Sequence, residues 1–210
     1  MGSVAIYQHS ALQALMWLRF IDQFCPSAQY IIKMDDDVVG NIFALLQYLK
    51  KRVDTVSLLD SQMCIFCRVI RHRAVERRKT RKWYVTMEEL PDKYYLNYCV
   101  GMAMVFTGDL PRTLLQAAQN ERYFWIDDYF ISGILAKKAD AHLMDWKRKV
   151  IVDSEAGEKE LIDGNIFFRL MSNMSQGQQL WERIQQEYFR RQLNESLQST
   201  TISWHDHYYI

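Results

Sequence analysis

The chain has 210 residues, a length typical of one domain and sufficient to bury a substantial core. Apolar residues make up 49% and charged residues 24%, and the net charge of +1 argues against a global field for nucleic acid or membranes. No window approaches 18 consecutive apolar residues, and the N-terminus lacks the layout of a signal peptide, so the sequence itself predicts no membrane helix or targeting segment.

The first fifty residues alternate helical and strand patterns. Apolar residues recur at helical spacing over 10–24, and Pro26 prevents continuation of that helix. The apolar run 29–34 indicates a strand, and Asn41 is predicted to cap a second helix that ends near 51–52. This order is typical of a parallel α/β sheet, which would place the intervening loop at the C-terminal end of a strand, where such sheets bind ligands.

Three consecutive carboxylates, Asp35, Asp36 and Asp37, occupy this loop. Adjacent acids repel one another, so a fold that holds them together usually uses a cation to neutralise them. Hard oxygen ligands suit Mg²⁺ or Mn²⁺, although an acidic surface cluster without a ligand is equally compatible with the triplet alone. An EF-hand is excluded, because Val39 and Leu46 stand where that motif needs oxygen ligands.

The middle of the chain contains a predicted strand and a basic stretch. Residues 56–70 indicate a strand interrupted by polar positions, and residues 68–82 are rich in Arg and Lys. Such a stretch is either a solvated loop or a contact with the phosphates of a nucleotide or nucleic acid. No aromatic residue interleaves with the basic side chains before Trp83, which argues against a platform for single-stranded nucleic acid.

Cysteine and asparagine patterns bear on the compartment. The pair 64–67 has CxxC spacing, but no second pair stands at zinc-finger distance, so we expect buried thiols or one disulfide rather than zinc. Asn173 and Asn194 each begin a glycosylation sequon, which matters only in a secretory lumen.

Two further helices and a strand follow. The aromatic and apolar run 94–107 indicates a strand, in which Gly101 suggests a bulge or a close approach of the backbone. Asp109 is predicted to cap the next helix. The acids Asp127 and Asp128 open another helix that continues to residue 136; acids there complement the helix dipole.

Near the C-terminus, residues 176–193 indicate an amphipathic helix, with apolar side chains on one of its sides.

Three segments resemble, in one order, the β-1,3-galactosyltransferase family (glycosyltransferase family 31). The family pattern of Lys, any residue, Asp-Asp-Asp-Val, two residues and Asn resembles Lys33 to Asn41. A Lys-Trp-Tyr-Val segment before a Tyr-Cys-x-Gly segment resembles residues 82–85 and 98–101. An acidic pair that opens a helix and is followed by a glycine resembles residues 127–133. The three segments together extend over residues 30–136.

The resemblance implies a glycosyltransferase-A-like α/β fold, a mixed sheet flanked by helices, and a hexosyltransferase. Such enzymes move a hexose or N-acetylhexosamine from a UDP-sugar to an acceptor glycan hydroxyl with inversion. Asp37 would be the ligand of Mn²⁺ or Mg²⁺, with Asp35 and Asp36 contacting water or the donor nucleotide, because the leaving diphosphate develops negative charge. Asp128 matches the catalytic aspartate, with Asp127 beside it; apposed carboxylates raise each other's pKa, which suits a base near neutral pH.

Four residues are expected to contact substrate by the same resemblance. Trp83, Tyr98 and Gly101 are candidates for the walls of the sugar sites, since pyranose faces stack on aromatic rings, and core packing is the alternative for these three. Lys33 stands beside the acids, on the donor side.

The resemblance also implies an organisation and a location. Family members begin with a membrane anchor and the first nucleotide-binding strands, which this sequence is expected to lack, so we predict one partial domain over 1–193 and a tail over 194–210. The location implied is the lumenal face of the Golgi membrane, and no nucleic-acid partner is expected. The His that often completes the metal ligands is replaced by Leu170. An inactive, truncated relative that acts as a binding or orphan protein is the alternative function.

Overall fold

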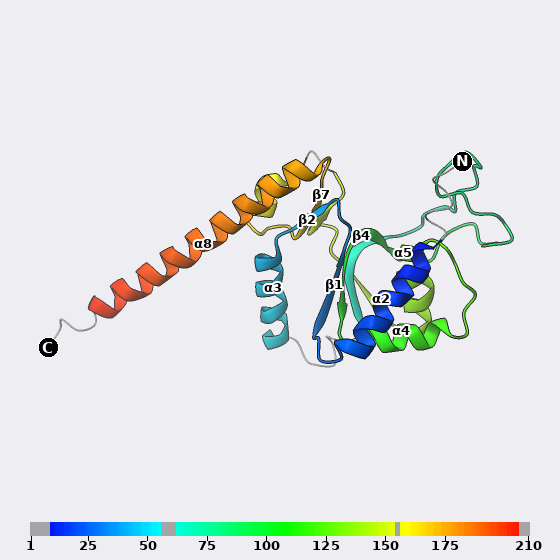
Figure 1. Cartoon of the computed structure of the whole chain (residues 1–210), viewed down its shortest axis with the longest axis horizontal. Helices are drawn as coiled ribbons and strands as arrows, with labels where there is room; N and C mark the ends of the chain where they lie inside the picture. Colours follow the sequence, from blue (N-terminus) through cyan, green and yellow to red (C-terminus); the bar gives the residue numbers. More distant parts are fainter. Residues whose placement is uncertain (1–8, 56–61, 154–155, 206–210) are drawn as a thin grey trace. The chain divides into compact units, whose positions relative to one another are not determined.

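The computed structural model describes residues 9–55, 62–153 and 156–205, and the chain forms two compact units (Figure 1). The first unit comprises Met1–Asp35 and Thr55–Arg148, and the second comprises Asp36–Asp54 and Lys149–Ile210. Each unit contains its own sheet and flanking helices, which confirms the predicted mixed α/β class. No helix within the described residues is long and apolar enough to cross a membrane.

The first unit is built on a four-stranded sheet in the order β1-β4-β3-β5. These strands are β1 (Tyr30–Met34), β3 (Cys64–Ile70), β4 (Tyr98–Thr107) and β5 (His142–Asp145). Strand β4 runs antiparallel to both β1 and β3, and β3 runs parallel to β5. The prediction that β1 belongs to a parallel sheet was wrong, because its hydrogen-bonded partner β4 runs antiparallel to it. Tyr30 pairs with Thr107, and Met34 pairs with Ala103.

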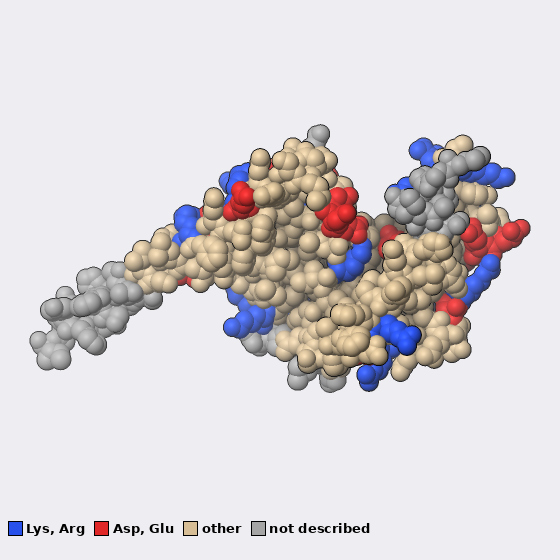
Figure 2. Space-filling model, in the orientation of Figure 1, with Lys and Arg blue, Asp and Glu red and all other residues tan. Residues whose placement is uncertain are grey.

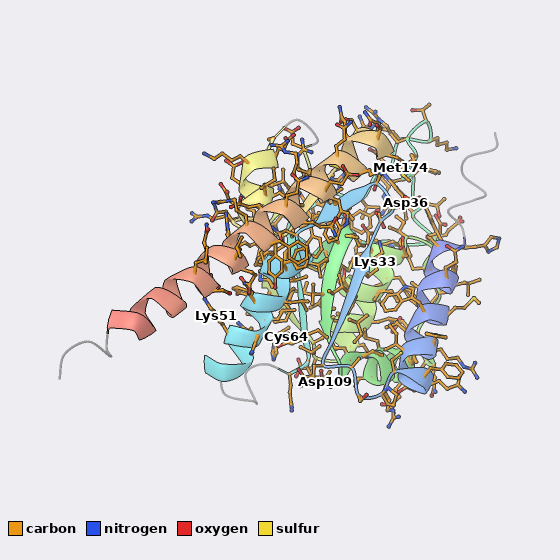
Figure 3. The ribbon with its side chains drawn as sticks, turned by 60° about the vertical axis from the view of Figure 1, so that its left-hand side comes forward. Lys33, Asp36, Lys51, Cys64, Asp109 and Met174 are labelled. Carbon is orange, nitrogen blue, oxygen red and sulfur yellow. A yellow bond between two sulfur atoms is a disulfide. The ribbon has the colours of Figure 1, made fainter. Side chains whose placement is uncertain are left out.

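Helices of the first unit lie on one side of this sheet in the views of Figures 1 and 3. They are α2 (Ser10–Phe24), α4 (Leu110–Ala118) and a continuous helical segment of α5 (Asp127–Tyr129), the π-helical η2 (Phe130–Leu135) and α6 (Ala136–Lys138). Side chains such as Leu18, Phe106 and Phe130 are at most 1% exposed and form the core between helices and sheet. Each buried side chain of this size contributes roughly 1.5–3 kcal/mol to folding.

Local patterns predicted some of these boundaries and missed others. Helix α2 covers the predicted residues 10–24, and β1 differs from the predicted strand by one residue. Of the predicted strand over 56–70, residues 56–61 lie outside the described part of the chain, and within the described part the strand begins at Cys64 and ends at Ile70 as predicted. Asp109 does not cap α4 through its side chain, because its carboxylate accepts a hydrogen bond from the backbone N–H of Met63 (2.9 Å).

The second unit contains a three-stranded sheet in the order β2-β7-β6. Its strands are β2 (Val38–Gly40), β6 (Val150–Ile151) and β7 (Phe168–Leu170), and its helices are α3 (Ile42–Thr55), α7 (Glu158–Ile162) and α8 (Met174–His205). The predicted cap at Asn41 is confirmed: its side-chain oxygen accepts from the N–H of Ala44 (3.0 Å), and its amide donates to the carbonyl of Leu161 (2.7 Å). The predicted C-terminal helix exists and is longer than the pattern indicated.

Charged side chains of both signs are mixed over the face of the protein in Figure 2, and neither sign forms a continuous field there. This distribution agrees with the net charge of +1. Any recognition of a charged ligand therefore depends on local groups rather than on a global field.

Candidate active site

The acid triplet begins where β1 ends, as the sequence predicted. The backbone N–H of Asp35 donates to the carbonyl of Met102 on β4 (2.9 Å), which continues the antiparallel pairing one residue beyond the strand. Lys33 donates through its ammonium group both to the carboxylate of Asp35 and to the carbonyl of Gly101. Lys33 therefore joins the end of β1 to Gly101 of β4.

Asp36 and Asp37 belong to the second unit, where they form an exposed turn before β2. The carbonyl of Asp37 accepts a hydrogen bond from the N–H of Met171 (2.7 Å), so the turn is fixed to the residue that follows β7. Within the part of the chain that the structure describes, no three or more His, Cys, Asp or Glu side chains gather in a group that would hold a metal ion.

Asp128 lies at the start of α5, directly against Gly101 of β4. A Cβ atom at position 101 would lie 3.2 Å from the Cβ and 3.3 Å from Oδ2 of Asp128, closer than ordinary side-chain contacts. The Asp128 carboxylate accepts a hydrogen bond from the N–H of Tyr129 (2.7 Å) and another from the backbone of Gly101. The glycine predicted to allow a close approach therefore lets the strand backbone reach the carboxylate.

The pKa of Asp128 is raised to about 7, chiefly because the carboxyl group is desolvated by burial and secondly because of the neighbouring charge of Asp127. The N–H of Tyr129, the ammonium of Lys33 and the backbone of Gly101 oppose this shift. Asp128 therefore exchanges its proton near neutral pH, the property that a general base needs. The predicted effect of the acidic pair is present, but burial contributes more to it than Asp127 does.

A pocket of 460 Å³ opens beside Asp128, and Trp83 and Tyr98 form parts of its wall. Trp83 is 37% exposed and stacks on Trp125 (ring centroids 5.8 Å apart, 18° between planes). Tyr98 is buried and meets Tyr129 edge to face, with the ring centroids 5.5 Å apart. The two aromatic residues predicted for the sugar sites thus line one pocket with the predicted base, although Tyr98 also packs in the core. The other predicted substrate contacts, Lys33 and Gly101, are not among the residues that line this pocket.

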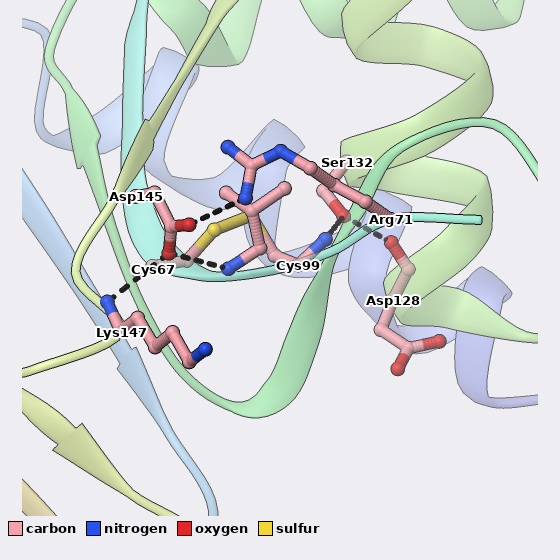
Figure 4. The surroundings of a disulfide bond; sticks show 8 residues. Cys67, Arg71, Cys99, Asp128, Ser132, Asp145 and Lys147 are labelled. Carbon is pink, nitrogen blue, oxygen red and sulfur yellow. Dashed lines mark hydrogen bonds and ion pairs between the residues drawn. A yellow bond between two sulfur atoms is a disulfide. The ribbon is translucent and has the colours of Figure 1, made fainter. Parts of the chain in front are cut away.

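A buried hydrogen-bond chain links Asp128 to the disulfide of the first unit (Figure 4). The backbone N–H of Cys99 donates to the hydroxyl of Ser132 (2.8 Å), and this hydroxyl donates to the carbonyl of Asp128. Cys99 forms a disulfide with Cys67 on β3, whereas the buried Cys64 and the exposed Cys25 are not in disulfides. The bond is therefore the one disulfide that the sequence left open, and it does not join the CxxC pair.

Several residues of this site were not identified from the sequence. Ser132 lies four residues after Asp128, and the only signal for it was its position within the helical run. Tyr95, Arg73 and Glu76 also line the pocket. The last two come from the basic stretch, for which the sequence favoured a solvated loop over a contact with phosphates.

The mixed α/β architecture is that of a glycosyltransferase-A-like domain, and Asp128 lies in the wall of a pocket with aromatic lining. The family model described as galactosyltransferase matches residues 4–147, and the chain belongs to this family. This result confirms the family suggested by the three sequence segments.

Curated relatives carry related names. The chain is 33% identical over 133 residues to lactosylceramide 1,3-N-acetyl-beta-D-glucosaminyltransferase A of Xenopus laevis. The aligned region covers 63% of this chain and 34% of that protein. It is 25% identical over 132 residues to human beta-1,3-galactosyltransferase 5, covering 63% of this chain and 41% of that protein. The matched region thus spans about a third to two fifths of the length of these relatives.

Proposed function

We propose that this chain carries the base-bearing and acceptor-binding part of a hexosyltransferase that uses a UDP-sugar donor. The transferred hexose or N-acetylhexosamine would pass to a hydroxyl of an acceptor glycan with inversion at the anomeric carbon. The observation that carries the proposal is Asp128, a carboxylate with a pKa of about 7 in the wall of a pocket lined by Trp83 and Tyr98. Residues 1–193 would form the partial glycosyltransferase-like domain, and 194–210 its tail.

In this reaction the bond from the acceptor oxygen to the anomeric carbon forms as the bond from that carbon to the diphosphate breaks. Asp128 takes the proton of the acceptor hydroxyl, so that the attacking oxygen does not carry a positive charge. Asp127 helps to keep the pKa of Asp128 high enough for this transfer. Lys33 holds the carbonyl of Gly101, and Gly101 leaves room for the carboxylate, so both residues position the base.

The acid triplet suits a divalent ion that is bound mainly by the donor. Mg²⁺ and similar ions are commonly held by one or two carboxylates together with substrate phosphates and water rather than by a cage of protein ligands. Asp36 and Asp37 lie in an exposed turn, and Asp35 is engaged by Lys33, so Asp37 with Asp36 would provide the protein oxygens for Mn²⁺ or Mg²⁺. Such an ion, when bound, stabilises the negative charge that develops on the diphosphate.

Asp37→Ala is expected to weaken the Mn²⁺-dependent binding of UDP by at least about ten-fold, because charge-assisted oxygen ligands contribute well over 1.4 kcal/mol each. Isothermal titration of UDP with and without Mn²⁺ measures the effect. Glu182→Ala, which removes an exposed carboxylate from α8, serves as the matched control and should leave the affinity unchanged. Equal UDP affinity in Asp37→Ala and the control would refute the metal assignment.

Turnover tests the proposed function itself. The chain is incubated with Mn²⁺, each of a panel of UDP-hexoses and UDP-N-acetylhexosamines, and galactose- or N-acetylglucosamine-terminated acceptors, and the release of UDP and the new glycan are measured. Acceptor-dependent release of UDP with formation of a β-linked product is the expected result. Sugar binding without any turnover would favour the alternative, an inactive relative that acts as a binding protein.

The Cys67–Cys99 disulfide supports a secretory location, since such bonds persist in oxidising compartments. We propose the lumenal face of the Golgi membrane, where an N-terminal anchor would hold the protein and where UDP-sugars and glycan acceptors would meet. Glycosylation at Asn173 and Asn194 belongs to the same proposal.

A further inference from the structure

The pocket beside Asp128 contains a cation that the reaction above does not use. Arg73 lines this pocket together with Tyr95 and Tyr98. Its side chain is exposed, and it forms neither an ion pair nor a hydrogen bond with any residue that the structure describes. A guanidinium group that faces a binding pocket without an acidic partner is available to an anionic ligand.

Three other arginines of the basic stretch, Arg71, Arg77 and Arg78, have structural partners in the described residues. Arg71 pairs with Asp145 (2.5 Å), and Arg77 donates to the backbone carbonyls of Val85, Thr86, Leu90 and Asp92. Arg78 pairs with Glu76 (2.6 Å) and is the main reason why the pKa of Glu76 is lowered to about 2. The acid in this part of the pocket is therefore already neutralised by Arg78 and does not compensate Arg73.

The backbone around Arg73 is fixed rather than free. The carbonyl of Arg73 accepts a hydrogen bond from the N–H of Tyr95 (2.9 Å), and the N–H of Val75 donates to the carbonyl of Lys93 (3.0 Å). Between these bonds, Ala74 pairs with Tyr94 in an antiparallel bridge. The backbone from which the Arg73 side chain projects is therefore held beside the tyrosines of the pocket, so ligand binding does not have to order this segment.

Two opposite charges act on the tyrosine hydroxyls of the pocket. Burial, followed by Asp128, raises the pKa of Tyr98 well above its ordinary value, and Arg73 opposes this shift. The pKa of Tyr95 is raised to about 12 by burial and by the charges of Tyr129 and Asp128, again with Arg73 in opposition. The pocket therefore has a carboxylate and a guanidinium group among its lining residues, and both charges act on the tyrosine hydroxyls.

We propose that Arg73 binds an acidic substituent, a carboxylate or a sulfate, on the acceptor sugar. The inference rests on the proposed function, because it is the acceptor hydroxyl that must meet Asp128 in this pocket. Arginine presents its N–H groups in a planar fork that matches the oxygens of carboxylate and sulfate, and lysine does not reproduce this geometry. The substrate class that follows is an acidic glycan, in preference to a neutral one with the same reacting hydroxyl.

Binding of paired monosaccharides tests this assignment without requiring turnover. Ligand-observed NMR titrations compare methyl β-glucuronide with methyl β-glucoside, and methyl β-galactoside 6-sulfate with methyl β-galactoside. At least one acidic member should bind about ten-fold more tightly than its neutral counterpart, and the pair that shows the preference distinguishes carboxylate from sulfate. Arg73→Gln should abolish the preference, and Arg73→Lys should restore only part of it. Arg81→Gln, a change in the same basic stretch outside the pocket, should preserve it.

Each other outcome overturns the proposal. Equal affinity for acidic and neutral sugars, binding of none of them, or a preference that persists in Arg73→Gln would exclude an anion site at this residue. A loss of UDP affinity in Arg73→Gln would assign the guanidinium to the donor diphosphate instead. Turnover of neutral acceptors without an acid preference would overturn this site and leave the proposed function intact. An Arg73-dependent preference without any turnover would support the site and overturn the proposed function.

Discussion

Asp128→Asn is expected to lower kcat by about 10³-fold with little change in KM for the donor, because a positioned general base contributes about 10²–10⁴-fold. Asparagine has nearly the same shape and can still accept the hydrogen bond from the N–H of Tyr129, so the pocket should keep its form. What is lost is the group that takes the acceptor proton at neutral pH. Initial rates of UDP release at pH 8, with saturating donor and varied acceptor, measure the effect.

The pH profile distinguishes loss of a base from a structural defect. For the unaltered chain, kcat/KM for the acceptor should rise as pH passes through about 7 and then level off, because Asp128 must lose its proton to act. Asp127→Asn is the matched control: it removes a charge that raises the pKa of Asp128, so its profile should shift to lower pH while activity at pH 8 is largely kept. If kcat/KM for the acceptor did not fall below pH 7, or if Asp128→Asn kept its activity, Asp128 would be excluded as the general base.

The same group links stability to pH in a direction opposite to that of most carboxylates. In the unfolded chain Asp128 loses its proton near pH 3.8, whereas in the folded chain it keeps the proton until about pH 7. Between these values the folded state binds more protons, so the contribution of Asp128 to stability falls as pH rises and is lost above pH 7. Because this carboxyl group is largely buried, we expect Asp128→Asn to gain up to roughly 3–4 kcal/mol relative to the unaltered chain between pH 4 and pH 8. Urea unfolding at both pH values checks the sign.

The fold could be predicted from the sequence where its cause is local. Helix α2 follows from apolar spacing and Pro26, and the start of α3 follows from the side chain of Asn41, which accepts the hydrogen bond expected of a cap. The antiparallel pairing of β1 with β4 could not be predicted, since about seventy residues separate the strands and no pattern in β1 specifies its partner. The carboxylate of Asp109 was misassigned for a similar reason: it bonds a backbone group 46 residues away.

The candidate site shows the same division. The family resemblance proposed Asp128 as the base and Lys33 and Gly101 as substrate contacts. The first unit brings these three residues together, with Lys33 bonded to the Gly101 carbonyl and Gly101 packed against Asp128. The reason for the raised pKa was only half foreseen, because burial depends on packing that the sequence does not state. Ser132 was missed because its importance comes from its hydrogen bond with the N–H of Cys99. Arg73 was missed because its importance comes from having no acidic partner among the described residues.

Removal of the disulfide by Cys67→Ala with Cys99→Ala is expected to destabilise the first unit by about 3–4 kcal/mol. The bond joins residues 32 positions apart, and closing a loop of that length restricts the unfolded chain by about this amount. Both cysteines are fully buried, so two small cavities add to the loss. Urea unfolding followed by tryptophan fluorescence measures the free energy, and mass spectrometry under non-reducing conditions confirms the bond in the unaltered chain.

The disulfide also stands at one end of the hydrogen-bond chain that reaches Asp128, so its loss should affect catalysis at temperatures where the variant remains folded. Movement of the Cys99 N–H away from Ser132 would release the carbonyl of Asp128 and let water reach the carboxylate, which lowers its pKa. The pH profile of the double variant should therefore shift to lower pH together with a smaller kcat. Cys25→Ala is the control, since this exposed thiol takes no part in the hydrogen-bond chain and its removal should change neither the pH profile nor kcat.

A double variant with unchanged stability would mean that the disulfide does not constrain the first unit. An unchanged pH profile in a destabilised variant would show that the bond stabilises the fold without positioning the base.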